Sequence, residues 1–460
     1  MTQASAGYTL PEKVLQFGAG VLLRALPDYF IDKANRAGIF SGTILVVKTT
    51  GEKVDPAFAL QDNLYTLAVR GIAGGQQICE NTILSPISRV LHASTSWSLI
   101  LEAAHNKELK IIISNTTEEG ISYVGESIFL NPPQSYPAKL LAFLFERFKA
   151  FGGTIDSGMV ILPTELLPDN AARLKAVVLR LAGENKLGDL FAGWLSYHNY
   201  FCNTLVDRIV PGKPDSPEEI QGMTGYRDEL LCVAEPYCLW AIEGGKDIAA
   251  ALSFHLADER VVITPNIQLY RELKLRLLNG THILGCGVAL LSGFETVSAA
   301  MADPEMAAFL SELLLNELAP AIPFHTGSAV SHAYGLEVLD RFRNPGLAHK
   351  WVRIATDHAS KLRIRVVPVL KQHYKLRLGT PRCIALGFAA WCCLMRDEQG
   401  GDAFFTADEL AAGVLGRQQL WETNLNELPG FSQQVQEFIT LILSAGIRQV
   451  LVQLNAKKLF

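Results

Sequence analysis

The stretch VLQFGAGVLL, residues 14–23, decides the fold class of this 460-residue chain. Its apolar start at 14–17 predicts a buried strand, Gly18-Ala19-Gly20 follows directly, and helical periodicity extends over 21–37. A strand, a glycine turn and a helix in this order are typical of dinucleotide binding, because the glycines permit a tight turn and let a pyrophosphate approach the helix N-terminus. Glycine pairs also occur at such turns for structural reasons alone. The third position of G-x-G-x-x-G is Leu23, which predicts a helix packed further from the strand or a variant of the pattern.

The rest of the first half repeats this alternation of strand and helix. Short β-branched runs at 43–47, 109–113 and 159–162 read as further buried strands. Strands that alternate with helical segments are typical of a parallel sheet with helical crossovers.

From about residue 270 the pattern changes, because long helical periodicity dominates and strand-like runs almost vanish. The expected helices are 273–291, 306–318, 347–354, 384–396 and 431–454. We therefore predict an α/β N-terminal domain with a parallel sheet at 1–265, and a mostly α-helical C-terminal domain at 266–460.

Composition excludes several classes of protein. The formal net charge is −5 and no run is rich in Lys or Arg, so no nucleic acid partner is expected. Residues 1–11 lack the basic and apolar parts of a signal peptide, and the apolar stretches are too short to span a membrane, which predicts a cytoplasmic protein. The eight cysteines form no C-x-x-C pair, so we expect buried thiols and no metal. The oligomeric state, monomer or small homo-oligomer, stays open.

Six residues are candidates for binding a nicotinamide dinucleotide. Lys48 follows the second strand, where NAD-selective folds usually place an acid; a lysine there favours the 2′-phosphate of NADP, or is simply solvated. Small polar residues after strand 109–113 lie where ligands bind in parallel sheets, although such residues also cap helices. The candidates are Phe17, Gly18, Gly20, Lys48, Asn115 and Thr116.

A K-x4-N-x2-H pattern carries the candidate catalytic residues, Lys274, Asn279 and His282. On an α-helix these three side chains fall within an arc of about 140°, so they can face one pocket. During ketone reduction the oxygen needs a proton donor and a stabilising hydrogen bond, which a partly desolvated lysine and an asparagine amide can supply. The histidine can orient the substrate. The alternative is a solvated lysine with structural Asn and His, and Asn279-Gly280 marking a kink or helix end.

The chain resembles the polyol-specific long-chain dehydrogenases, the mannitol dehydrogenase family, and within it the uronate-reducing branch. The resemblance rests on motifs in a consistent order over most of the chain. They are residues 16–20, 23–25, 114–118, 120–123, 135–140, 204–210, 274–282 and 341–345.

The resemblance implies an active site between a Rossmann-type and a helical domain, with Lys274 as general acid and base. It implies substrate contacts at Arg341 and at His349, where mannitol dehydrogenases have a lysine. Asn203, just before Thr204, is a further candidate contact, with the substrate or with the nicotinamide. It also implies NAD as the cofactor, because the uronate branch too tends to carry a basic residue near Lys48.

One position departs from the mannitol dehydrogenases, since Leu166 replaces their second oxyanion asparagine. This favours a uronate substrate, and its carboxylate needs a basic partner. The candidates are Arg341, Arg343, His349 and Lys350.

The activity implied is the reversible NAD-dependent reduction of D-tagaturonate to D-altronate. Alternatives within the family are fructuronate, mannitol or another hexitol, or a hexitol phosphate. An alternative of another class is a non-catalytic nucleotide-binding regulator, which would not need to keep Lys274, Asn279 and His282. A metal-dependent polyol dehydrogenase is disfavoured, because no Cys/His cluster has ligand spacing.

Overall fold

A computed structural model gives the structure of the chain and describes residues 10–456 except 52, 215, 326, 348 and 399–406. The chain divides into two compact units. Residues 1–70 and 79–267 form the first, and residues 71–78 and 268–460 form the second.

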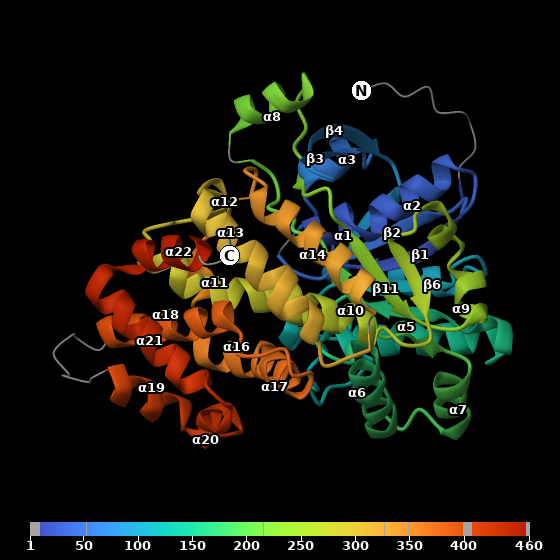
Figure 1. The fold of residues 1–460 in the computed structure, drawn as a ribbon. Coiled ribbons are helices and arrows are strands. Elements are labelled where there is room, and N and C mark those ends of the chain that lie inside the picture. Colours follow the sequence, from blue (N-terminus) through green and yellow to red (C-terminus); the bar gives the residue numbers. More distant parts are fainter. Residues whose placement is uncertain are drawn as a thin grey trace. The chain divides into compact units, whose positions relative to one another are not determined.

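The first unit is built on a six-stranded sheet in which every neighbouring pair is parallel (Figure 1). Across the sheet the order is β5-β2-β1-β6-β7-β8, which is the 3-2-1-4-5-6 order of the doubly wound dinucleotide-binding fold. The predicted α/β fold class is confirmed. The strands are β1 (Glu12–Phe17), β2 (Thr43–Lys48), β5 (Ile87–His92), β6 (Ile111–Ser114), β7 (Val160–Pro163) and β8 (Tyr200–Phe201).

Both faces of this sheet are buried, which explains why its strands read as continuous apolar runs. Along β1, Val14 packs into the core on one face, while Leu15 and Phe17 pack into the core on the other. The first core includes residues of α1 (Val21–Ala25) and α2 (Pro27–Arg36). The second includes residues of α4 (Ala93–Glu102), α5 (Tyr136–Phe151), α6 (Asn170–Glu184) and α7 (Asp189–Tyr197).

The single helix expected at 21–37 is wrong, because the chain breaks at Leu26 between α1 and α2. Pro27 lacks a backbone N–H and restricts the residue before it, and Leu26 has a non-helical backbone with φ −130° and ψ −78°.

Two small sheets were not predicted. One has the order β10-β3-β4 and the other β12-β11-β9. Their strands are β3 (Tyr65–Ala73), β4 (Gln76–Leu84), β9 (Thr204–Asp207), β10 (Cys232–Ala234), β11 (Leu239–Glu243) and β12 (Val261–Thr264).

The second unit is helical, and no strand follows β12 in the part of the chain that the structure describes. Helix α11 (Asn279–Leu291) packs against α18 (Arg382–Glu398), which in turn packs against α21 (Phe431–Ala445). Helix α14 (Ser328–Arg343) and helix α16 (His358–Arg365) also belong to this unit.

Four expected helices of this unit need correction. In the segment 306–318, α13 (Pro304–Glu312) is followed by a π-helical stretch at Leu313–Leu318. The segment 273–291 contains a π-helical turn at Lys274–Leu278 after α10 (Gln268–Leu273), as described below. Only Trp351–Ile354 (α15) of the expected helix 347–354 is helical. The expected helix 431–454 is two helices, because Gly446 at φ +79° ends α21 before α22 (Ile447–Ala456).

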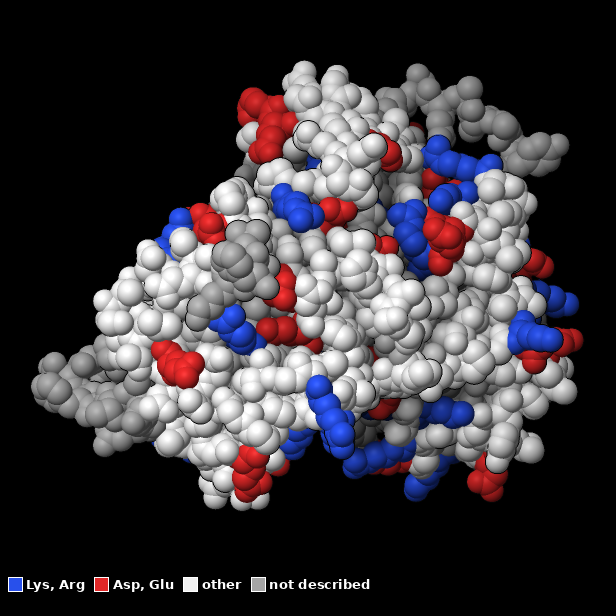
Figure 2. All heavy atoms as spheres, in the orientation of Figure 1, with Lys and Arg blue, Asp and Glu red and all other residues white. Residues whose placement is uncertain are grey.

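The surface carries both basic and acidic side chains, as the small net charge of −5 leads one to expect. Figure 2 shows Lys and Arg interspersed with Asp and Glu over the face that it draws. In the described part of the chain, none of the helices combines the length and the apolar character that a membrane span requires.

A buried histidine makes the stability of the second unit depend on pH. His358 begins α16, packs against Trp391 with ring centroids 6.1 Å apart, and has its pKa lowered by burial to about 4. The unfolded chain therefore takes up a proton near pH 6.5, whereas the folded chain does so only near pH 4.

We predict that His358 makes the free energy of unfolding fall by about 1.4 kcal/mol per pH unit as the pH drops from about 6.5 to 4. Urea unfolding of wild type and His358→Gln at pH 7, 6 and 5 would measure this pH dependence. The difference in the free energy of unfolding between the two proteins isolates the contribution of His358. The prediction would be contradicted if the free energy of unfolding varied with pH in the same way in both proteins.

Candidate active site

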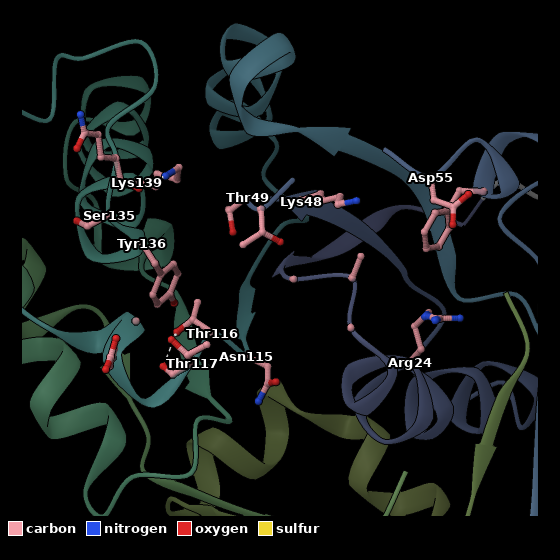
Figure 3. A pocket seen from close by; sticks show the side chains of 18 of the residues that line it. Arg24, Lys48, Thr49, Asp55, Asn115, Thr116, Thr117, Ser135, Tyr136 and Lys139 are labelled. Atoms are coloured by element: carbon pink, nitrogen blue, oxygen red, sulfur yellow. Dashed lines mark hydrogen bonds between the residues drawn. The ribbon is translucent and has the colours of Figure 1, made fainter. Parts of the chain in front are cut away.

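A cavity of about 860 Å³ lies in the first unit at the carboxyl ends of β1, β2 and β6. Ligands bind at this edge of parallel sheets, where the strand order reverses between β1 and β6. In Figure 3, Thr116, Thr117 and Tyr136 lie on one side of the cavity, and Arg24 and Asp55 on the other. Five of the six predicted cofactor residues line it: Gly18, Gly20, Lys48, Asn115 and Thr116.

The sixth predicted residue, Phe17, is fully buried and does not line the cavity. Its ring packs against Tyr136, which does line the cavity, with centroids 5.2 Å apart. The role of Phe17 in cofactor binding stays a prediction.

Gly18 and Gly20 have different physical roles. Gly18 has φ +123°, and a Cβ there would lie 2.9 Å from Cδ1 of Leu23 and 3.2 Å from the carbonyl oxygen of Asn115. Gly20 precedes α1 with φ −69°, and a Cβ there would meet nothing within 4 Å. Gly18 is therefore required by the turn itself, whereas Gly20 leaves open space at a helix N-terminus, which fits a pyrophosphate. Leu23, the departure from the glycine pattern, is buried against Gly18.

The turn at Asn115 and Thr116 is fixed by a buried carboxylate that sequence reasoning missed. Glu165 Oε1 accepts hydrogen bonds from Thr116 N (2.9 Å) and Thr116 Oγ1 (3.0 Å), and its Oε2 accepts one from Ser114 Oγ (3.2 Å). Asn115 Nδ2 donates to both oxygens of Thr164. Burial raises the pKa of Glu165, although the hydrogen bonds from Thr116 oppose the shift. The only sequence signal was its position at the end of a strand beside β6.

Lys48 ends β2 at the rim of the cavity. Its Nζ donates to the carbonyl of Lys53 at 2.8 Å, so the ammonium is tethered to its own loop. Thr49 and Thr50 continue the rim.

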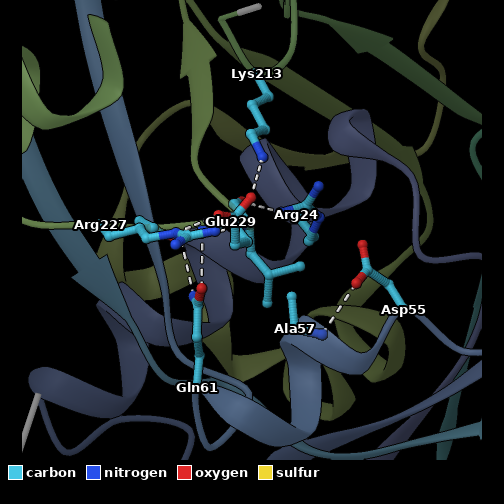
Figure 4. Close-up of polar contacts among 9 residues, drawn as sticks. Arg24, Asp55, Ala57, Gln61, Lys213, Arg227 and Glu229 are labelled. Atoms are coloured by element: carbon cyan, nitrogen blue, oxygen red, sulfur yellow. Dashed lines mark hydrogen bonds and ion pairs between the residues drawn. The ribbon is translucent and has the colours of Figure 1, made fainter. Parts of the chain in front are cut away.

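A polar network that the sequence did not indicate lines the opposite rim (Figure 4). Glu229 accepts from Lys213 Nζ (2.5 Å) and Arg227 Nε (2.6 Å), and its backbone N–H donates to Gln61 at 2.8 Å. Arg24 Nη1 donates to the carbonyl of Leu230. These bonds hold the segment 229–231 against the cavity.

We predict that Gly18→Ala lowers both the melting temperature and NADH affinity, because the new Cβ clashes with Leu23 and strains the backbone. Gly20→Ala is the matched control for the fold: it should change stability by less than about 1 kcal/mol yet weaken NADH binding about tenfold or more. Thermal unfolding and NADH fluorescence titration measure the two effects. Unchanged NADH affinity in Gly20→Ala would show that the cofactor does not approach this turn.

The predicted catalytic residues of the second unit lie on a π-helical turn, Lys274–Leu278, and the first turn of α11. The backbone N–H of Asn279 donates to the carbonyl of Lys274, an i→i+5 bond. The expected uninterrupted α-helix is thus wrong. A π turn has more residues per turn than an α-helix, so residue i+5 lies closer to the face of residue i than the separation of about 140° in an α-helix. Lys274 and Asn279 therefore share one face of the segment.

His282 lies one turn further along, buried among aromatic rings. Its ring stacks on Phe342 with centroids 4.3 Å apart and meets His349 edge-on at 4.8 Å. Burial, then His349, Arg341 and Arg365, lower the pKa of His282 well below its ordinary value, so the ring is neutral at neutral pH. Among the described residues, no hydrogen-bond partner reaches its buried Nε2.

The structure places two predicted substrate residues, Arg341 and His349, beside His282. Burial and the charge of Arg341 lower the pKa of His349. Arg341 is itself buried near the end of α14.

Three other predicted residues already have protein partners. Asn203 accepts from the backbone N–H groups of Ala171 and Ala172 and donates to Glu243 at 2.7 Å, so it anchors the start of α6. Arg343 pairs with Asp340 at 3.2 Å, and Lys350 pairs with Glu295 at 2.6 Å, both near the surface. A substrate contact at Asn203 stays a prediction.

Comparison with known proteins identifies the family. Residues 12–255 match the Mannitol dehydrogenase Rossmann domain, and residues 266–443 match the Mannitol dehydrogenase C-terminal domain. The chain belongs to the mannitol dehydrogenase family. The resemblance inferred from the motifs is confirmed.

Curated relatives in this family are more specific. The chain is 36% identical to an altronate oxidoreductase of Bacillus subtilis (strain 168), over 96% of this chain and 95% of the relative. It is 35% identical to an altronate oxidoreductase of Klebsiella pneumoniae (strain 342), over 96% of both chains. The chain is thus an oxidoreductase acting on a CH–OH group with a nicotinamide cofactor.

Two solved structures of similar fold support the architecture. Substrate-free D-sorbitol dehydrogenase has a TM-score of 0.76 at 20% identity, covering 95% of this chain and 94% of that chain. The Pseudomonas fluorescens mannitol 2-dehydrogenase ternary complex with NAD and D-mannitol has a TM-score of 0.65 at 22% identity, covering 98% and 96%.

Proposed function

We propose that this mannitol dehydrogenase family member reduces D-tagaturonate to D-altronate with NADH, reversibly. The π turn that brings Asn279 onto the same face as Lys274, one turn before a neutral His282, carries the proposal. Full-length relatives named altronate oxidoreductase support the substrate. A cytoplasmic location stays a prediction from the sequence.

The first unit would hold the dinucleotide. Gly18 and Gly20 would face the pyrophosphate, and the Asn115–Thr116 turn held by Glu165 would lie toward the nicotinamide half. When bound, the reduced nicotinamide supplies the hydride. We propose NAD over NADP because Lys48 is tethered to the Lys53 carbonyl and because a structural relative is a complex with NAD.

The second unit would supply the proton donor and acceptor. As negative charge develops on the ketone oxygen, the Lys274 ammonium donates a proton to it and the Asn279 amide donates a hydrogen bond. In the reverse direction neutral Lys274 removes the hydroxyl proton. Neutral His282 can hydrogen-bond a substrate hydroxyl through Nε2, with Phe342 and His349 fixing its ring. These steps use no metal.

NADH oxidation, followed by absorbance, should be faster with tagaturonate than with fructuronate or fructose. Mannitol 1-phosphate is assayed in the oxidative direction, and its reduction of NAD should be slower than tagaturonate turnover. NADPH in place of NADH should lower kcat/KM. Faster turnover of another substrate would keep the family and contradict the substrate. NADH binding without turnover of any of them would instead favour a non-catalytic regulator.

Replacing the proton donor should slow the chemical step strongly without preventing cofactor binding. Lys274→Met should lower kcat by about 10²- to 10⁴-fold, because general acid catalysis contributes that much, with NADH affinity unchanged. Lys350→Met is the matched control, since Lys350 is exposed and paired with Glu295, and it should keep wild-type kcat. Wild-type kcat in Lys274→Met would mean that another group is the acid.

A further inference from the structure

Arg365, at the end of α16, is a half-buried arginine that sequence reasoning did not consider. Its guanidinium makes no salt bridge with a carboxylate among the described residues. Burial lowers the pKa of Arg365, and no acidic neighbour offsets the shift. A guanidinium partly removed from water without a counter-ion is costly, so a reason for its position is needed.

The backbone of Arg365 is tied directly to the π turn. Arg276, two residues after Lys274, donates through Nη1 to the carbonyls of Ile364 and Arg365, the latter at 3.2 Å. Arg276 itself is held by a buried ion pair with Glu272 at 2.8 Å. In addition, α16 packs against α11, the helix that carries His282. These contacts fix the end of α16 beside the predicted catalytic segment.

The surroundings of His282 are positively charged. Arg341 and Arg365 both lower the pKa of His282, after burial and His349, and Arg365 acts in the same direction on Lys361. Each of these three neighbours, His349, Arg341 and Arg365, shifts the pKa of His282 in the same direction as burial does. The acid nearest in sequence to Lys274, Glu272, is already used by Arg276. A cluster of cations around a buried neutral ring fits an anionic ligand better than a neutral sugar.

We propose that Arg365 binds the carboxylate of the hexuronate substrate while Lys274 and Asn279 hold its ketone. This inference rests on the proposed function and names its specificity-determining residue. A guanidinium suits the role because it can donate two parallel hydrogen bonds to one carboxylate. Arg343 and Lys350 suit it less, because Asp340 and Glu295 already neutralise them.

The test compares a uronate with its neutral counterpart. Arg365→Ala should lower kcat/KM for tagaturonate by about 100-fold or more, since a charge pair in a desolvated site is lost, while kcat/KM for tagatose stays within a few-fold of wild type. Arg365→Lys should retain an intermediate activity, and added guanidinium ion should partly restore Arg365→Ala. Arg343→Ala is the matched control and should behave as wild type with both substrates.

The possible failures are distinguishable. A wild type that reduces tagaturonate, with Arg365→Ala equally active, overturns the role of Arg365 and leaves the proposed function standing. Equal losses with tagatose and tagaturonate, or a large drop in melting temperature in both Arg365 variants, would mean a structural role and also overturn it. A wild type that reduces tagatose but no hexuronate contradicts the proposed function and this inference together.

Discussion

One backbone hydrogen bond, from Asn279 N–H to the carbonyl of Lys274, sets the geometry on which the predicted chemistry depends. It widens the helix for one turn and brings an ammonium and an amide onto the same face. A π turn is less favourable than an α turn, so it must be held by other contacts. The buried Glu272–Arg276 pair, with its bonds to the end of α16, supplies them.

In each unit a buried ionisable side chain holds the backbone that carries predicted functional groups. In the first unit Glu165 holds the Asn115–Thr116 turn through Thr116 and Ser114. In the second unit Arg276 holds the π turn. Both contacts hold backbone in place, which suits predicted functional groups that must be positioned before a substrate arrives.

The sequence was sufficient for the parts of the molecule that depend on local pattern. Strand β1, the Gly18 turn and the helix-rich second half follow from periodicity and from glycine chemistry. The break at Leu26 was missed, although Pro27 restricts the residue before it and so indicates a helix boundary. The π turn could not be predicted, since K-x4-N spacing is compatible with an α-helix. Glu165 and Arg365 were missed for another reason: their roles come from contacts with residues far away in the chain, which no local pattern encodes.

Chemical rescue tests the central claim, that Lys274 on the π turn carries the proton, most directly. Turnover of tagaturonate by Lys274→Ala would be measured with and without added primary amines of different basicity. We predict that amines restore part of the lost kcat in this variant and that the rescued rate varies with amine basicity. The kcat of wild type should be unaffected by the amines. Intact NADH binding with no rescue by any amine, or near wild-type kcat without one, would contradict it.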